Sequence, residues 1–196
     1  QLLASYGDAR HPETGFPVFA FRLHQFLSRG DTVYASIEPE TERHITLQGQ
    51  QFVPGDRTRA LLPLVFCREC GQEYYCVRRG LDPESHSRTF HPRELSDRTE
   101  DEGEDTAGFL YASSDAPWPS TPEEARDRLP DDWLEDRGGT PRVRADRRGD
   151  VPQLLRVNGL AREAETGLDV AWIAAPFRFC LRCGISWGHR QTSDFP

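Results

Sequence analysis

The chain has 196 residues, enough for one or at most two compact domains, and carries 24 basic and 32 acidic residues, a formal net charge of -8. All the basic residues are arginines, and the acidic excess excludes the broad basic surface of an autonomous nucleic-acid-binding domain. No run reaches the ~18 apolar residues that cross a bilayer, and no signal segment opens the chain. We therefore expect a cytoplasmic protein with no membrane partner, and the initial Gln1 suggests a piece of a longer protein.

The first third of the chain predicts one helix followed by strands. The stretch "PVFAFRLHQFLSRG" spaces Phe19, Leu23 and Phe26 along one helical face. This helix is expected to begin near Pro17 and end at Gly30. Partial alternation and β-branched residues then predict strands in "TVYASIEPE" and "RHITLQGQQFVP", and two more strands, "LLPLVFC" and "EYYCVRR", flank the first cysteine pair as a ribbon.

The middle of the chain is more polar. Its stretch "RELSDRTEDEGEDT" has too little apolar surface to offset the entropy lost on ordering, so we predict a mobile acidic insertion over about 80–140. Within it, "TPEEARDRLPDDWLEDRGG" predicts a short helix, because Ser120 or Thr121 can cap it and Pro122 suits its first turn. Pro130 is expected to interrupt this helix.

Strands are predicted again after residue 141. The stretch "PRVRADRRGDVPQLLRVNG" resembles a hairpin with its turn at Arg148, Gly149 and Asp150, and "LDVAWIAAPFRFC" is an apolar run into the second cysteine pair. The elements together predict an α+β, mainly β fold of zinc-ribbon-like antiparallel strands with a few short helices and long loops. We expect one zinc-stapled accessory domain over 1–196.

Four of the five cysteines form two Cys-x-x-Cys pairs, Cys67 with Cys70 and Cys180 with Cys183. Such a segment bends so that both thiolates face one point, and the glycine that follows each pair supplies a positive φ at low cost. Two such segments complete a tetrahedral sulfur site, the geometry that structural Zn²⁺ prefers. The duplicated motif therefore predicts one structural zinc ion.

More than 100 residues separate Cys70 from Cys183, far beyond the spacing of compact zinc fingers. Loop closure costs only the logarithm of loop length, however, and metal binding contributes on the order of 10 kcal/mol. Two alternatives stay open: four buried thiols that act as small apolar groups, and a redox pair, which sits between a strand and a helix. Cys76 is expected to be a buried core thiol, and His24 and His189 are candidates for a replacement ligand or a contact with a ligand.

No phosphate-binding glycine loop, nucleophile elbow or helicase-type acidic pair occurs in the sequence, so we predict no catalytic site in this chain. A stand-alone enzyme, such as a thiol oxidoreductase or a zinc hydrolase, is the weakest interpretation. A metal ion with four thiolate ligands has no open position for water.

The stretches "RLHQFLSRGDTVYAS", "FCRECGQEYY", "RLPDDWLE" and "APFRFCLRCGISWG" resemble the cysteine-rich segment of large bacterial DEAD/DEAH-type helicases. This class is similar to the mitomycin repair factor helicases and to phage-defence helicases such as those of DISARM and Druantia. The resemblance runs from about 16 to 194, and its specific parts are the cysteine pairs and the motif Arg22, His24 and Phe26. Some members have extra cysteines shortly after that motif, where this chain has "VYASIEPE".

The resemblance implies an accessory domain of an ATP-dependent DNA helicase or translocase in DNA repair or anti-phage defence. Two RecA-like motor lobes of the same chain would bind ATP and Mg²⁺ outside this segment, and the domain would position the lobes or guide DNA. Other defence or repair subunits are further expected partners. The implied zinc ligands are Cys67, Cys70, Cys180 and Cys183. The arginines expected to meet phosphate groups are Arg142, Arg144, Arg147, Arg148, Arg178 and Arg182.

For each of these arginines, an exposed ion pair with a nearby carboxylate is the alternative. The net negative charge also favours an alternative function for the whole chain. A zinc-stapled module can bind a partner subunit through its acidic loop and an exposed Trp118 or Trp133, without touching nucleic acid. Salt-dependent binding of DNA would count against this alternative.

Overall fold

The computed structural model describes residues 32–83, 86–95, 105–136 and 138–188, all within the unit Thr32–Pro196. Most of the regular structure among them is antiparallel strand, with few and short helices, which confirms the predicted α+β, mainly β fold. None of the described helices has the length and apolarity to cross a membrane. The helix predicted near Pro17, the motif of Arg22, His24 and Phe26, and His189 lie outside the described residues.

Eleven strands and one α-helix make up the regular structure of the described residues, with two short 3₁₀ helices at Asp131–Trp133 and Ala145–Asp150. In chain order the elements are β1 (Tyr34–Ser36), β2 (Ile45–Thr46), β3 (Phe52–Val53), β4 (Asp56–Phe66), β5 (Glu73–Leu81), β6 (Arg88–Pro92), β7 (Thr106–Tyr111), α2 (Pro122–Asp127), β8 (Leu134–Asp136), β9 (Pro141–Val143), β10 (Gln153–Val157) and β11 (Leu168–Ala174).

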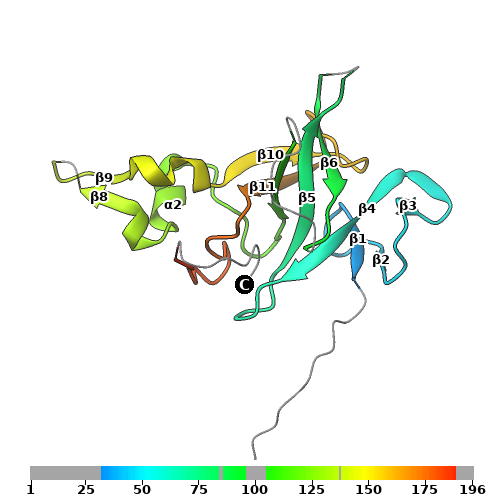
Figure 1. Cartoon of the computed structure of the whole chain (residues 1–196), viewed down its shortest axis with the longest axis horizontal. Helices are drawn as coiled ribbons and strands as arrows, with labels where there is room; N and C mark the ends of the chain where they lie inside the picture. Colours follow the sequence, from blue (N-terminus) through cyan, green and yellow to red (C-terminus); the bar gives the residue numbers. More distant parts are fainter. Residues whose placement is uncertain (1–31, 84–85, 96–104, 137, 189–196) are drawn as a thin grey trace, which may run out of the picture. The chain divides into compact units, whose positions relative to one another are not determined.

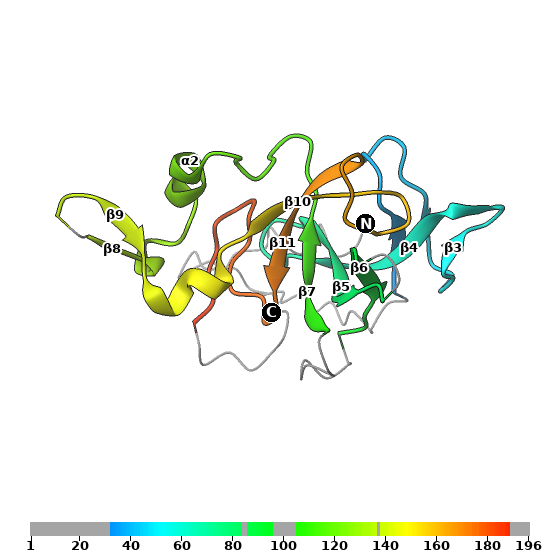
Figure 2. The ribbon, with the colours of Figure 1, turned by 90° about the horizontal axis from the view of Figure 1, so that it is seen from above.

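Nine of these strands form one antiparallel sheet, and β8 pairs with β9 in a separate ribbon (Figure 1). Seven strands follow one another in the order β10-β11-β7-β5-β4-β1-β2, while β3 joins β4 and β6 joins β5. Figure 2 shows β7, β11 and β10 following one another at one end of this order. The predicted strands on either side of the first cysteine pair are β4 and β5, and they pair as a ribbon as expected.

The central strand of the sheet is β5. Its first half pairs with β4 and its second half with β6, and β7 pairs along its other edge. The sequence "EYYCVRRGL" gives this strand apolar residues on both sides: Tyr74 and Cys76 face one buried cluster, and Tyr75 and Val77 face the other. The buried position of Cys76 confirms the predicted core thiol.

The aromatic packing on the Tyr74 face positions the chain after β11. Phe177 lies edge to face with Tyr74, with ring centroids 4.9 Å apart. Phe179 contacts Trp118 and Trp133 in the same way, at 5.9 and 4.9 Å. Because these rings are buried, the second cysteine pair is held on the same face of the sheet as the residues around the first.

The segment from about 80 to 140, predicted as a mobile insertion, supplies part of the sheet. Strand β7 pairs with both β5 and β11 and is buried from residue 107 onward, so the prediction does not hold for β6 and β7. The apolar run "AGFLYA" is long enough for a central strand despite its acidic neighbours. Helix α2 begins as predicted, with Thr121 as its cap, and ends before Pro130. Residues 96–104, the acidic core of the predicted insertion, lie outside the described residues.

The hairpin predicted around Arg148, Gly149 and Asp150 is wrong. These residues belong to the 3₁₀ helix Ala145–Asp150, and β10 pairs with β11 instead. The side chain of Arg147 explains the difference, because it is buried over the ring of Trp133, at 5.2 Å, and pairs with the Asp150 carboxylate at 3.2 Å. The turn is therefore held against the core by its own arginine.

Gly108 lies in β7, where a Cβ atom would be 2.3 Å from the Trp172 ring and 2.4 Å from the carbonyl oxygen of Ile173. We expect Gly108→Ala to lower the free energy of unfolding by about 1–3 kcal/mol, because the neighbouring strand β11 cannot retreat without losing its pairing. Urea denaturation followed by tryptophan fluorescence measures this. The control is Gly149→Ala, where a Cβ meets nothing within 4 Å. Equal effects of the two substitutions would contradict the prediction.

Candidate metal centre

Two turns with the same hydrogen bonds hold the cysteine pairs. In the first, the N–H of Cys67 donates to the carbonyl of Gln72 at 2.9 Å, and the N–H of Gly71 donates to the carbonyl of Cys67 at 2.8 Å. The second turn repeats both bonds around Cys180, at 2.8 and 2.9 Å. Gly71 and Gly184 have φ values of 78° and 75°, a conformation that glycine adopts without strain. The sequence motif thus folds locally, in the same way, twice.

The two turns bring four sulfur atoms together. One Sγ from each of Cys67, Cys70, Cys180 and Cys183 lies within 4.8 Å of all the others, so this group can hold a metal ion. The Sγ atoms of Cys67 and Cys183 are 4.0 Å apart, and those of Cys70 and Cys180 are 3.7 Å apart. These are the four cysteines predicted from the sequence as ligands. The first cysteine of each turn is buried and the second is exposed.

The hydroxyl of Tyr74 contacts this group from the sheet. It lies 3.2 Å from the Sγ of Cys180 and accepts a hydrogen bond from the N–H of Leu181 at 2.9 Å. Burial raises the pKa of Tyr74 far above its ordinary value, so the phenol stays protonated and can donate to the sulfur. Such a donor favours the thiolate form of a ligand and fixes its position. Apart from the aromatic residues around each cysteine pair, no feature of the sequence predicts this role of Tyr74.

The surroundings of the sulfur group oppose ionisation of two of its thiols, Cys67 and Cys183. Burial raises the pKa of Cys67, and partial loss of water together with the neighbouring thiols Cys180 and Cys70 raises the pKa of the exposed Cys183 to about 12. Burial also opposes ionisation of Cys180, but the backbone N–H of Cys183, the Tyr74 hydroxyl and further donors outweigh it and lower its pKa. The surroundings therefore favour the thiolate of Cys180 over those of Cys67 and Cys183. A bound cation would supply the positive charge that ionisation of Cys67 and Cys183 requires.

Side chains join the second turn to its surroundings. Arg128 donates to the carbonyl of Leu181 and, at 2.7 Å, to that of Pro117. Arg182, which lies between the second pair of cysteines, donates to the side chain of Gln72 at 3.2 Å. Gln72 belongs to the first turn and is 4% exposed, so this bond links the two turns next to the sulfur atoms. Sequence reasoning missed it, because no spacing rule relates residues this far apart.

The arginines expected to meet phosphate differ in their surroundings. Three already have a carboxylate partner: Arg144 with Asp146, Arg147 with Asp150, and Arg182 with Asp115. Arg147 is also buried, so its guanidinium is not available to a phosphate group, and the prediction for this residue is corrected. Arg178 is half-buried and donates to the carbonyl of Gly188 at 3.4 Å. Arg142 and Arg148 are exposed.

The tryptophans proposed for partner binding are not on the surface. Trp118 is 6% exposed and Trp133 is 1% exposed, because both pack on Phe179. The expectation of an exposed tryptophan is therefore wrong. Their packing on Phe179 instead holds the second turn in place, since Phe179 directly precedes Cys180.

No protein-family model, curated protein or solved structure matches this chain.

The Tyr74 hydroxyl tests whether the sulfur group is a metal site with a supporting donor. Tyr74→Phe should weaken the affinity for Co²⁺ by about 10-fold or more while the fold is kept, because the ring stays and the hydroxyl that donates to Cys180 and accepts from the N–H of Leu181 is lost. Absorbance of the cobalt–thiolate bands in a titration measures the affinity. Tyr75→Phe is the control, because its hydroxyl donates to the Ser36 carbonyl instead. Equal cobalt affinities of both variants and the parent protein would refute the role of Tyr74.

Proposed function

We propose that this chain is a zinc-binding module in which one structural Zn²⁺ holds two distant chain segments together. The four-thiol group carries this proposal. Zn–S bonds of about 2.3 Å in a tetrahedron place the sulfur atoms about 3.8 Å apart. In the structure, the Sγ atoms of Cys70 and Cys180 are 3.7 Å apart and those of Cys67 and Cys183 are 4.0 Å apart. Four thiolate ligands leave no position for a reactive water, so the role that fits is structural.

The free energies involved favour a metal-bound site over four buried thiols without a metal. Closing a loop of the size between Cys70 and Cys180 costs about 4 kcal/mol in chain entropy, since the cost rises with the logarithm of length. A structural zinc contributes about 10 kcal/mol or more. A redox pair has less support, because neither turn precedes a helix: β5 follows the first, and the described residues after the second are not helical.

Zinc content tests the structural role. The purified chain should contain about one zinc per molecule by elemental analysis, and Cys67→Ser should lose the metal and most of its stability, because three ligands remain around a broken clamp. Cys76→Ala is the matched control, because that thiol lies outside the sulfur group and its removal should leave the zinc in place. A protein that stays metal-free and fully folded would overturn the proposal.

We further propose that the module is an accessory domain of an ATP-dependent DNA helicase or translocase. The support is the resemblance of its two cysteine stretches to the zinc-binding segment of the large bacterial DEAD/DEAH-type helicases. A zinc clamp between the β4–β5 turn and the chain after β11 would give a rigid body against which two RecA-like lobes of the same chain can move. ATP and Mg²⁺ would bind in those lobes, and repair or anti-phage defence would be the setting.

ATP hydrolysis by the natural full-length protein tests the motor assignment. We expect hydrolysis to rise when single-stranded DNA is added, and Cys180→Ser to reduce this stimulation, because the clamp that orients the lobes is broken. Cys76→Ala again serves as the control. A full-length protein that hydrolyses no ATP with DNA or RNA would refute the motor and leave the zinc site standing, since zinc content is measured separately.

A module that binds a protein partner is the second candidate. The observation that favours it is the charge: the chain carries -8, and the carboxylate partners of Arg144, Arg147 and Arg182 reduce the cationic surface left for phosphate. Binding of a protein partner is compatible with the proposed zinc site, because an ion with four thiolate ligands would need no contact with that partner.

A further inference from the structure

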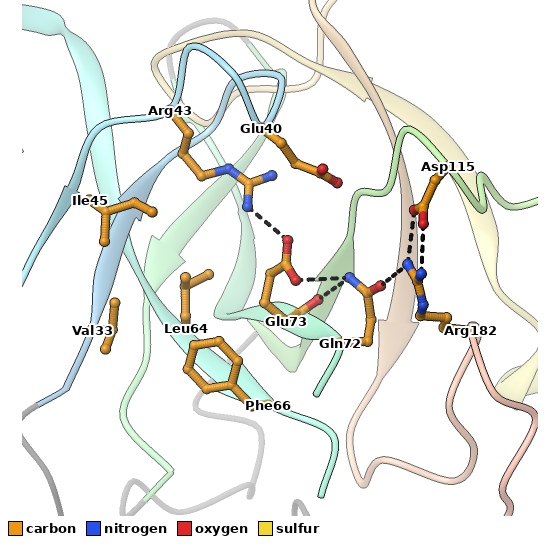
Figure 3. Close-up of a pocket in the computed structure, with 10 residues that line it drawn as sticks. All are labelled: Val33, Glu40, Arg43, Ile45, Leu64, Phe66, Gln72, Glu73, Asp115 and Arg182. Carbon is orange, nitrogen blue, oxygen red and sulfur yellow. Dashed lines mark hydrogen bonds and ion pairs between the residues drawn. The ribbon is translucent and has the colours of Figure 1, made fainter. Parts of the chain in front are cut away.

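A groove lies next to the first cysteine turn, because Phe66 and Gln72 on either side of that turn line it. Figure 3 shows the residues that line the groove. Its volume is about 400 Å³. One wall is apolar and comes from Ile45, Leu64 and Phe66; Ile45 and Phe66 are 62% and 45% exposed, although both are large apolar residues. Phe66 directly precedes Cys67, so this wall is continuous with the candidate metal centre.

The opposite wall is a chain of polar side chains. Arg43 pairs with Glu73 at 2.9 Å, and the amide of Gln72 donates to the other oxygen of Glu73 at 3.2 Å. Arg182 donates to the Gln72 oxygen and pairs with Asp115 at 2.6 Å. Figure 3 shows these bonds as one connected row. Each guanidinium in the groove is therefore already committed to a carboxylate.

This leaves Glu40 with an uncompensated charge. The groove contains three carboxylates and two guanidinium groups, and Glu40 forms no ion pair in the part of the chain that the structure describes. The one polar contact of its side chain recorded there is the backbone N–H of Ser114, at 3.5 Å. An anionic ligand such as a phosphate would meet this net negative charge with no available cation. A purely apolar ligand would remove Glu40 from water without a partner.

We infer that this groove binds a protein partner through a basic residue that is followed or preceded by an apolar one. The cation pairs with Glu40, its alkyl stem lies along Ile45, and the apolar neighbour packs on Phe66. Arginine fits best, because its planar guanidinium can donate two parallel hydrogen bonds to the Glu40 carboxylate. The inference goes beyond the proposed zinc clamp and names the partner chemistry of a second site.

The groove and the sulfur group are physically connected. Gln72 contributes its carbonyl to the first cysteine turn and its side chain to the groove, and Arg182 lies between the two ligands of the second turn. A correctly loaded metal site thus sets the position of the polar wall. For this reason the zinc content of every variant is measured alongside partner binding.

The probe is the capped peptide Gly-Leu-Arg-Phe-Arg-Leu-Gly, titrated into the zinc-loaded, ¹⁵N-labelled chain and followed by NMR. We expect shifts at the Gln72 side-chain amide and at Arg182, and little response to the analogue with glutamine in place of both arginines. Glu40→Gln should weaken peptide binding about fivefold or more, because the uncompensated carboxylate is lost. Glu42→Gln is the matched control, since it removes the same charge from a neighbouring exposed residue that does not line the groove.

Three results would overturn the inference: equal binding of the arginine and glutamine peptides, unchanged binding by Glu40→Gln, or an oligonucleotide that shifts the same residues in place of the peptide. Loss of peptide binding by Glu40→Gln with zinc retained supports the groove. Absence of zinc from the parent protein would refute the proposed clamp, and peptide binding by that same sample would still support the groove.

Discussion

The meeting of four sulfur atoms is the constraint on which the rest of this structure depends. Their cysteines lie 110 and 116 positions apart, and both pairs must reach one point. The β4–β5 turn fixes one pair, and the packing of Phe177 and Phe179 brings the other across the sheet. The sheet therefore positions both cysteine turns. The hydroxyl of Tyr74, a residue of the sheet, contacts the sulfur group directly.

What the sequence could predict was local. The two turns, the β4–β5 ribbon and the Thr121 cap follow from motifs and periodicity within a few residues, and the structure has all of them. The errors were tertiary in origin. A turn at Gly149 was expected to be a hairpin because sequence alone does not show that Arg147 is buried against Trp133. The central position of β7 was missed because the acidic residues before it dominate the composition of that segment. The link between Gln72 and Arg182 depends on the completed fold, so no local pattern contains it.

Several of the arginines, which are the chain's basic residues, have a structural role in the fold. Among the residues that the structure describes, five guanidinium groups lie over aromatic rings, at centroid distances of 5.0–5.4 Å, and these are Arg43, Arg79, Arg93, Arg128 and Arg147. A planar, weakly hydrated cation can stack on a ring and still donate in its own plane, which an ammonium group cannot do. Several arginines thus belong to the internal architecture. Their number in the sequence is therefore a poor measure of affinity for phosphate.

The equivalence of the two cysteine turns has a consequence for synthesis. The first half-site, with β4 and β5, emerges from the ribosome long before Cys180 does, because the chain grows from its N-terminus. Until then the nascent protein offers a cation only the two thiols of the first turn. Four thiols become available to one ion only when β11 and the segment after it have been synthesised and have packed on the sheet. An ion bound by all four thiols would in this way distinguish chains that extend through Cys183 from chains that stop before Cys180, since the latter have only two of the four ligands.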